Sequence, residues 1–176
     1  MEIESYAQQL IAFVKANQAW AAPVVFVLCF VESLAFISLL LPAWAALLGI
    51  GTLLGASDIL FWPVWIAGAI GAALGDWLSY WIGKVLGTRV YGYWPLSRHP
   101  QLIPKAEHFV EKWGAVAIFV GRFSGPLRAT VPLAAGIFHM PPLRFQLANW
   151  SSALLWAFIL LAFGDLTASV LGALWR

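Results

Sequence analysis

Apolar residues run along most of this chain, and the polar positions that interrupt them divide it into two similar halves. In the first half, an amphipathic stretch at residues 2–17 precedes residues 21–57, where Glu32 is the only charged residue. Residues 62–83 form a further apolar segment, and a membrane-spanning helix needs about 20 such residues. The pattern therefore predicts an all-α integral membrane protein with one clear crossing in its first half.

Residues 2–17 place apolar side chains, among them Ile3, Leu10 and Val14, on one helical face and polar side chains elsewhere. This pattern is typical of a helix that lies in the membrane interface. An ordinary amphipathic helix of a soluble protein has the same pattern, and it is the alternative. The apolar segments that follow favour contact with the membrane.

Residues 21–57 are too many for one span and leave little room for two spans with a loop. Pro42 interrupts the stretch, and a glycine-rich part follows it. Two half-length helices that enter the membrane and return on the same side fit this pattern better. Such a re-entrant hairpin requires that protein or a cavity surround its broken backbone.

The second half shows the same order of elements. Residues 84–112 are polar, and Pro104 fits the first turn of a helix that ends at Gly114. Residues 113–143 are apolar but interrupted by prolines, glycines and two arginines, which predicts a second re-entrant hairpin. Residues 145–164 carry no charge and form the second clear span, which could continue past Asp165 to Trp175. We expect the apolar side of the helix before Gly114 to face the membrane, with Leu102, Ala106, Phe109, Val110 and Trp113.

The two halves also align in sequence. The segment from Trp20 to Phe30 matches the segment from Trp113 to Phe123 without gaps, at a constant offset of 93 residues. One crossing per half would turn the second half over, as in the inverted repeats of many transporters. Chance similarity between two apolar segments is the alternative. We predict a single domain, 1–176, with repeat halves at approximately 1–83 and 84–176.

Composition supports a membrane location. Apolar residues make up 62% of the chain and charged residues 10%, whereas soluble domains contain about 25% charged residues. The net charge of +2 and the scattered basic residues do not indicate a nucleic-acid partner. Cys29 has no partner for a disulfide, and the three histidines lack the spacing of metal ligands, so we predict neither a metal site nor a cofactor.

Two acidic residues lie inside apolar segments. An acid at the depth of Glu32 costs roughly 2.5 kcal/mol or more unless it faces a cavity or a partner. Because burial disfavours the charged form, Glu32 could take up and release a proton, as could Asp76 in the first span. The alternatives are an acid at a hairpin tip for Glu32 and a plain salt bridge to an arginine for Asp76.

Two arginines, Arg122 and Arg128, lie within the second hairpin. They could pair with Glu32 and Asp76 and hold the hairpins together, or bind a phosphate group through bidentate contacts, and the two roles are compatible. Asn149, at the start of the last span, could form a hydrogen bond between helices. The candidate substrate-binding residues are Arg122, Arg128, Ser124 and Gly125, and the candidate proton-coupling residues are Glu32 and Asp76.

The sequence resembles the DedA family, which is related to the SNARE-associated or VTT-domain membrane proteins. The resemblance covers nearly the whole chain. It rests on five segments: Phe30-Val-Glu-Ser33 with Leu41-Pro42, Gly71-Ala-Ala-Leu-Gly-Asp-Trp-Leu-Ser-Tyr-Trp-Ile-Gly83, Phe109-Val-Glu-Lys-Trp-Gly114, Arg122-Phe-Ser-Gly-Pro-Leu-Arg128 and Ala135-Gly-Ile-Phe-His-Met140.

The resemblance implies a two-hairpin plan, and it links the chain to movement of undecaprenyl phosphate or a phospholipid between leaflets and to transport that depends on the proton-motive force. It also implies that Glu32 corresponds to the family's essential acid, and Arg122 and Arg128 to its essential arginines. Many members have an acid shortly after the hairpin proline, where this chain has Trp44. The departure puts two-acid proton coupling in doubt: either Asp76 substitutes, or the chain is an uncoupled translocator.

We therefore predict a flippase-like lipid translocator of the bacterial plasma (inner) membrane, multi-pass, with a membrane lipid as its partner. The alternative is a proton-coupled transporter of a small ion or solute. With no nucleophile-and-base pair in view, we do not expect an enzyme. The basic residues of 84–112 favour a cytoplasmic position for that segment. The sequence is compatible with an oligomer and does not set the number of subunits.

Overall fold

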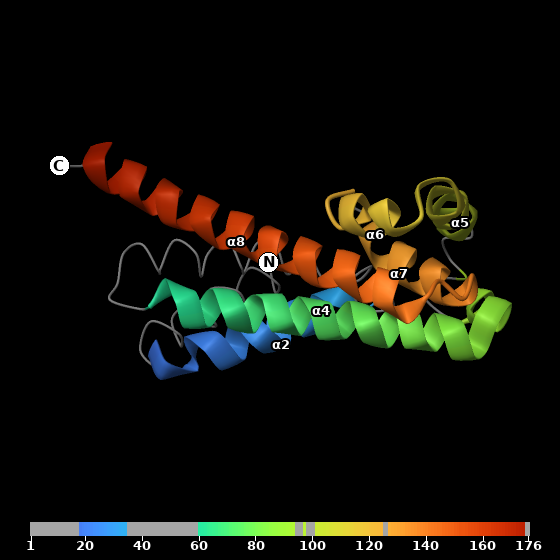
Figure 1. Ribbon diagram of the computed structural model, residues 1–176. Coiled ribbons are helices and arrows are strands. Elements are labelled where there is room, and N and C mark those ends of the chain that lie inside the picture. Colours follow the sequence, from blue (N-terminus) through green and yellow to red (C-terminus); the bar gives the residue numbers. More distant parts are fainter. Residues whose placement is uncertain (1–17, 35–59, 94–96, 98–100, 125–126, 175–176) are drawn as a thin grey trace.

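The computed structural model describes residues 18–34, 60–93, 97, 101–124 and 127–174, and the regular elements among them are helices (Figure 1). The first described element is a short 3-10 helix, η1 (Gln18–Trp20), which leads into α2 (Ala21–Ser33). The others are α4 (Phe61–Leu86), the 3-10 helix η2 (Gly87–Gly92), α5 (Leu102–Trp113), α6 (Ala115–Gly121), α7 (Leu127–Ile137) and α8 (Pro142–Leu174).

Within the described residues, two helices are long and apolar enough to cross a membrane. One span covers Phe61–Val90 with a mean hydropathy of 1.2, and the other covers Pro142–Phe163 with 1.4. Both predicted spans are thus confirmed as long apolar helices, and α8 continues past the second span to Leu174. The two helices run antiparallel: Trp65 near the start of α4 donates to the Leu154 carbonyl oxygen, whereas Ala73, further along α4, accepts from Asn149, which lies earlier in α8.

Exposed tryptophans lie near both ends of α4. Trp62 is 61% exposed and Trp81 is 56% exposed. Nineteen residues separate them, which corresponds to about 28 Å at the rise of an α-helix and is close to the ~30 Å thickness of the hydrocarbon core. Because tryptophan favours the membrane interface, this spacing fits a helix that crosses the bilayer.

Glycines let the helices next to α4 approach its backbone closely. A Cβ atom at Gly71 would collide with the Phe26 carbonyl oxygen of α2, and one at Gly75 would collide with the Phe30 carbonyl oxygen. On the α7 side, a Cβ at Gly136 would collide with the carbonyl oxygen of Tyr80. The small residues of this span therefore permit close helix packing, as the sequence predicts.

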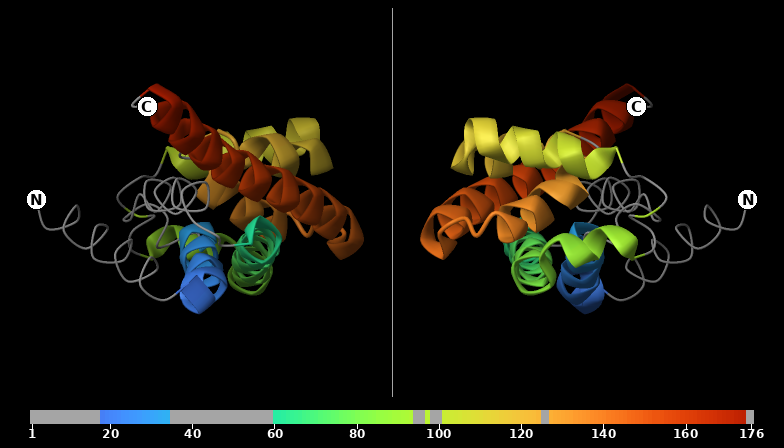
Figure 2. Two further views of the ribbon diagram at one scale, coloured as in Figure 1. Left: turned by 90° about the vertical axis from the view of Figure 1, so that its left-hand side faces the viewer. Right: turned by 90° about the vertical axis from the view of Figure 1, so that its right-hand side faces the viewer.

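Helix α7 lies between α4 on one side and α5 and α6 on the other (Figure 2). Residues 113–143 contain two separate helices, α6 and α7, so the predicted break in this segment is confirmed. Helix α2 packs on α4, and α6 packs on α8.

Other parts of the sequence interpretation lie outside the described residues. These parts are the interfacial helix at 2–17 and the return arm of the first hairpin, which includes Pro42 and Trp44. The inverted repeat and the re-entrant path of both hairpins therefore stay predictions.

The expectation for the apolar face of α5 was wrong in part. The helix ends at Trp113, before Gly114 with φ of 53°, as predicted. However, Ala106 is fully buried and Val110 is 4% exposed, because both belong to an apolar cluster with residues of α7 rather than facing the membrane. Phe109 packs against the same cluster, whereas Trp113 is 51% exposed. The side chain of Leu102 lies outside the described part.

Candidate functional site

Four charged side chains from different parts of the sequence meet inside the protein. Glu32 lies near the end of α2 and Asp76 lies in α4, while Arg122 follows α6 and Arg128 lies in the first turn of α7. Their exposed fractions are small: 6% for Glu32, 2% for Asp76, 3% for Arg122 and 8% for Arg128. The prediction that the hairpin arginines can pair with these two acids is confirmed.

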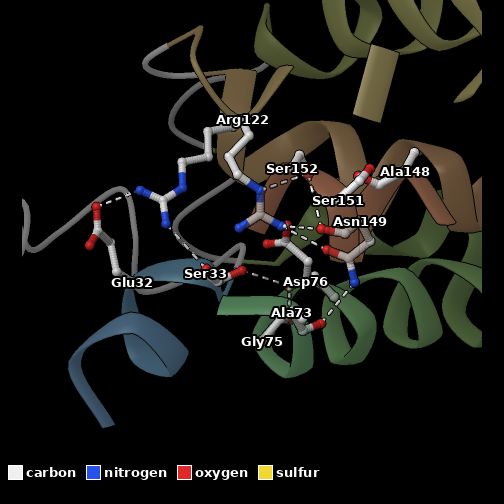
Figure 3. Close-up of polar contacts among 12 residues, drawn as sticks. Glu32, Ser33, Ala73, Gly75, Asp76, Arg122, Ala148, Asn149, Ser151 and Ser152 are labelled. Carbon is white, nitrogen blue, oxygen red and sulfur yellow. Dashed lines mark hydrogen bonds and ion pairs between the residues drawn. The ribbon is translucent and has the colours of Figure 1, made fainter. Parts of the chain in front are cut away.

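The first ion pair joins Arg122 to Asp76, with 2.5 Å between Nη2 and Oδ2. Arg122 also donates from Nε to the Ser152 hydroxyl oxygen at 3.0 Å and from Nη2 to the Asn149 Oδ1 atom at 2.7 Å. Figure 3 shows these contacts converging on the guanidinium group from α4 and α8. Arg122 is therefore held by two helices at once.

The second ion pair joins Arg128 to Glu32, with 2.6 Å between Nη1 and Oε1. Arg128 also donates to the Ser33 hydroxyl oxygen at 3.2 Å. Its guanidinium carbon lies 4.0 Å from the centre of the Trp156 ring on α8, which is a cation–π distance. Arg128 therefore has fewer polar partners than Arg122. The face of the Trp156 ring provides a further contact for its guanidinium group.

The local backbone explains why these groups meet. Gly75 allows the end of α2 to approach α4, and this contact brings Glu32 and Ser33 close to the turn of α4 that contains Asp76. In α7, Pro132 lacks the N–H group that would otherwise bond to the Arg128 carbonyl oxygen four residues earlier. The positions of the acids thus depend on helix packing, and those of the arginines on a short helical hairpin.

Each of the four charged groups has one buried atom without a hydrogen-bond partner among the residues that the structure describes. The four atoms are Glu32 Oε2, Asp76 Oδ1, Arg122 Nη1 and Arg128 Nε. Buried polar atoms nearly always have partners, so such atoms need an explanation. In Figure 3 the nitrogen of Arg122 that carries no dashed line points toward the side where Glu32 and Ser33 lie.

The remaining candidate residues are placed differently. The Ser124 hydroxyl donates to the Val120 carbonyl oxygen of the preceding helix, α6, at 3.0 Å, which leaves its oxygen available only as an acceptor. Gly125 lies outside the described residues. A substrate-binding role for both residues stays a prediction.

Sequence reasoning did not single out three residues of this site: Ser33, Ser152 and Trp156. It gave Asn149 only a modest role, yet this side chain is fully buried and contacts both Arg122 and α4. The sequence did contain a signal for this role of Asn149. A side-chain amide within a charge-free membrane span needs hydrogen-bond partners inside the protein. Ser152 and Trp156 follow Asn149 at helical spacing, which places all three near the same face of α8.

Comparisons with known proteins agree with this picture. The family model described as VTT domain matches residues 41–166. The chain is 35% identical to inner membrane protein YabI of Escherichia coli (strain K12) over 144 residues, covering 82% of this chain and 57% of YabI. It is 32% identical to inner membrane protein YqjA of the same strain over 142 residues, covering 80% of this chain and 64% of YqjA.

An uncharacterized membrane protein of Buchnera aphidicola is 33% identical over 147 residues, covering 84% of this chain and 57% of that protein. The chain thus spans less than two thirds of the length of these relatives. No solved structure matches it. The names of the relatives agree with the location predicted from the sequence, the inner membrane of a bacterium.

Proposed function

Since the chain belongs to the DedA family of VTT-domain proteins of the bacterial inner membrane, we propose that it moves a phosphate-bearing lipid between the two leaflets. The observation that carries this proposal is the pair of buried arginines, each with one nitrogen that has no partner among the described residues. Arginine presents its donors in a planar fork that matches phosphate oxygens. Undecaprenyl phosphate and phospholipids are the substrates that such a site would suit.

The two arginines would need an anion at every stage of transport. A guanidinium group does not lose its proton in a protein, and an unpaired charge inside a membrane is costly. Asp76 and Glu32 would neutralise Arg122 and Arg128 when no substrate is bound. A phosphate group would then replace one or both carboxylates, so the site alternates between a self-paired state and a substrate-bound state.

The two ion pairs would have different roles. Arg122 has Asp76, Asn149 and Ser152 as polar partners, whereas Arg128 has Glu32 and Ser33 beside the Trp156 ring. Arg122 is then the fixed part of the phosphate site, and Arg128 is the part that exchanges partners. Protonation of Glu32 removes its negative charge and releases Arg128, which would couple transport to protons.

The proposed path of the lipid follows from the position of the site. Asp76 lies fourteen residues after Trp62 and five before Trp81, so a phosphate bound at the charged cluster would lie inside the hydrocarbon core, about 8 Å from the interface at Trp81. If both hairpins are re-entrant, as the sequence predicts, their broken backbone would surround the passing head group. The hydrocarbon chain would stay in the lipid. The polar segment at residues 84–112 would lie in the cytoplasm.

A second candidate is a proton-coupled transporter of a small ion or solute. The observation that favours it is the burial of two acids, Glu32 and Asp76, each with one carboxylate oxygen that has no partner among the described residues. Both could then carry protons. Trp44, in place of the acid that many DedA members have after the hairpin proline, counts against coupling through two acids in the family's manner.

Leaflet exchange in liposomes tests the proposal. The purified protein is reconstituted, and exchange of a labelled polyprenyl phosphate is followed with and without a pH gradient. We expect exchange by the wild type and its loss in Arg122→Ala and Arg128→Ala. Arg144→Ala, at an exposed arginine near the start of α8, is the matched control and should exchange lipid at the wild-type rate.

The same preparation separates the two candidates. Loss of the response to the gradient in Glu32→Gln, with exchange retained, would support proton coupling of lipid transport. A folded wild type that exchanges no lipid phosphate but moves protons across the liposome membrane would contradict the lipid proposal and favour the transport of a small ion.

A further inference from the structure

A groove lies between α6 and α8 on the outside of the protein. It has a volume of about 420 Å³ and is lined by Ala115, Val116 and Phe119 from α6 and by Leu147, Ala148 and Ser151 from α8. Leu147 at its rim is 66% exposed and Val116 is 52% exposed. In a protein of the inner membrane, such exposed apolar side chains face lipid. The groove therefore opens toward the bilayer.

The lining of the groove suits a hydrocarbon chain. Five of its six residues are apolar, and the hydroxyl of the sixth, Ser151, donates to the Leu147 and Ala148 carbonyl oxygens of its own helix at 2.7 and 3.1 Å. The lining side chains thus present no free hydrogen-bond donor. A peptide or a polar head group would leave its own polar atoms unpaired there, which is unfavourable, whereas a lipid chain would not.

The groove ends close to the arginine site. Its α6 wall ends at Phe119, one helical turn before Arg122. Its α8 wall ends at Ser151, and the next residue, Ser152, accepts a hydrogen bond from Arg122 at 3.0 Å. Arg122 also has a buried nitrogen, Nη1, without a partner among the described residues. Along both helices the apolar groove thus lies within one helical turn of a buried positive charge or of its hydrogen-bond partner.

We propose that this groove holds the first part of the hydrocarbon chain of a lipid whose phosphate group binds Arg122. The lipid then enters the site sideways from the bilayer, between α6 and α8. This inference rests on the proposed function and adds to it the route of entry and the requirement for a long chain. A molecule with the phosphate but without the chain would bind much more weakly.

Photocrosslinking in liposomes tests where the chain lies. A photoreactive benzoylphenylalanine is placed at Leu147, on the rim of the groove, or at Leu155, which is 42% exposed on the same helix and outside the groove. Each protein is exposed to a labelled polyprenyl phosphate and, separately, to the uncharged polyprenol of the same length. We expect the Leu147 position to capture the phosphate lipid several-fold better than the alcohol, and Leu155 to capture both equally.

Groove-filling variants provide the second measurement. Ala148→Trp should lower the affinity for polyprenyl phosphate by about tenfold, because the bulky ring displaces several methylene groups of the chain. Inorganic phosphate, which has no chain, should bind this variant and the wild type alike. The matched control is Ala67→Trp, which adds the same ring at a half-buried alanine of α4 outside the groove.

The outcomes separate the two proposals. If Arg122→Ala abolishes lipid exchange while Ala148→Trp behaves like Ala67→Trp and both crosslinking positions capture lipid equally, the groove proposal is wrong and the proposed function stands. If the wild type exchanges no lipid phosphate and neither position prefers it over the alcohol, the proposed function fails as well. Crosslinks from Leu147 to a second copy of the chain would assign the groove to self-association and overturn the lipid proposal.

Discussion

Asn149 on α8 donates its side-chain amide to the Ala73 carbonyl oxygen on α4 at 2.9 Å. This contact fixes the direction of the amide, so that its oxygen faces Arg122 and accepts a hydrogen bond at 2.7 Å. One uncharged side chain thus connects the two long apolar helices and orients the more firmly held arginine. The positioning of Arg122 depends on this residue as well as on the ion pair with Asp76.

Replacement of Asn149 by alanine should destabilise the protein. The change removes one hydrogen-bond acceptor from the buried guanidinium group of Arg122. An unsatisfied buried polar group lowers the free energy of unfolding by about 1–3 kcal/mol. Unfolding of the purified protein in detergent measures the loss. Gln101→Ala is the control, because Gln101 is exposed and makes no capping hydrogen bond through its side chain. Equal stability of the two variants would show that Asn149 does not hold Arg122.

The two members of an ion pair should not contribute independently to stability. Asp76→Asn leaves Arg122 as an uncompensated buried charge, and breaking a buried pair from one side costs about 3–5 kcal/mol. The double variant Asp76→Asn with Arg122→Gln removes both charges, so it should be more stable than the sum of the two single losses predicts. Glu111→Gln, at an exposed acid of α5, should have little effect. Additive losses in this cycle would contradict a direct interaction in the folded protein.

Sequence reasoning found the charged groups of this site for a physical reason. Glu32, Asp76, Arg122 and Arg128 interrupt apolar segments, and a charge inside a membrane requires a partner. The hypothesis that opposite charges pair follows directly from that requirement. The long spans were equally accessible, because the length and hydropathy of a membrane helix are constrained by the thickness of the bilayer.

The sequence did not reveal which acid meets which arginine or what surrounds them. The pairing of Arg122 with Asp76 depends on the packing of α6 against α8 and of α8 against α4, which no local pattern encodes. The contact between Trp156 and Arg128 could not be predicted for a similar reason. The chain has eleven tryptophans, and no sequence pattern indicates which of their rings lies against an arginine. The apolar face of α5 was misassigned because lipid and the apolar surface of α7 favour the same side chains.

The close contact between α4 and α7 should be sensitive to a single methyl group. In Gly136→Ala the new Cβ would collide with the backbone carbonyl oxygen of Tyr80, which cannot move without shifting α4. Overpacking of this kind costs about 1–3 kcal/mol. Gly92→Ala is the matched control, because no atom lies within 4 Å of a Cβ at that position. Detergent unfolding of the two variants compares them directly, and equal stability would contradict the observed packing.

Binding of a lipid phosphate should respond to pH through Glu32. When Glu32 is protonated it no longer neutralises Arg128, so protonation of Glu32 should raise the affinity of the wild type for polyprenyl phosphate. Glu32→Gln resembles the protonated form at every pH and lacks this rise. A phosphate monoester loses negative charge when the pH falls below its second pKa of about 6, so the variant should bind more weakly in acid. The phosphate titrates in both experiments, so the affinity of the wild type relative to that of the variant should rise as the pH falls.

A titration of polyprenyl phosphate binding from mildly alkaline to mildly acidic pH measures these trends. Glu111→Gln removes a carboxyl group on the exposed side of α5 and should keep the wild-type profile. If Glu32→Gln follows the same profile as the wild type, another group controls binding. Glu32 would then only hold Arg128 in place, and the exchange of partners at Arg128 would not explain proton coupling.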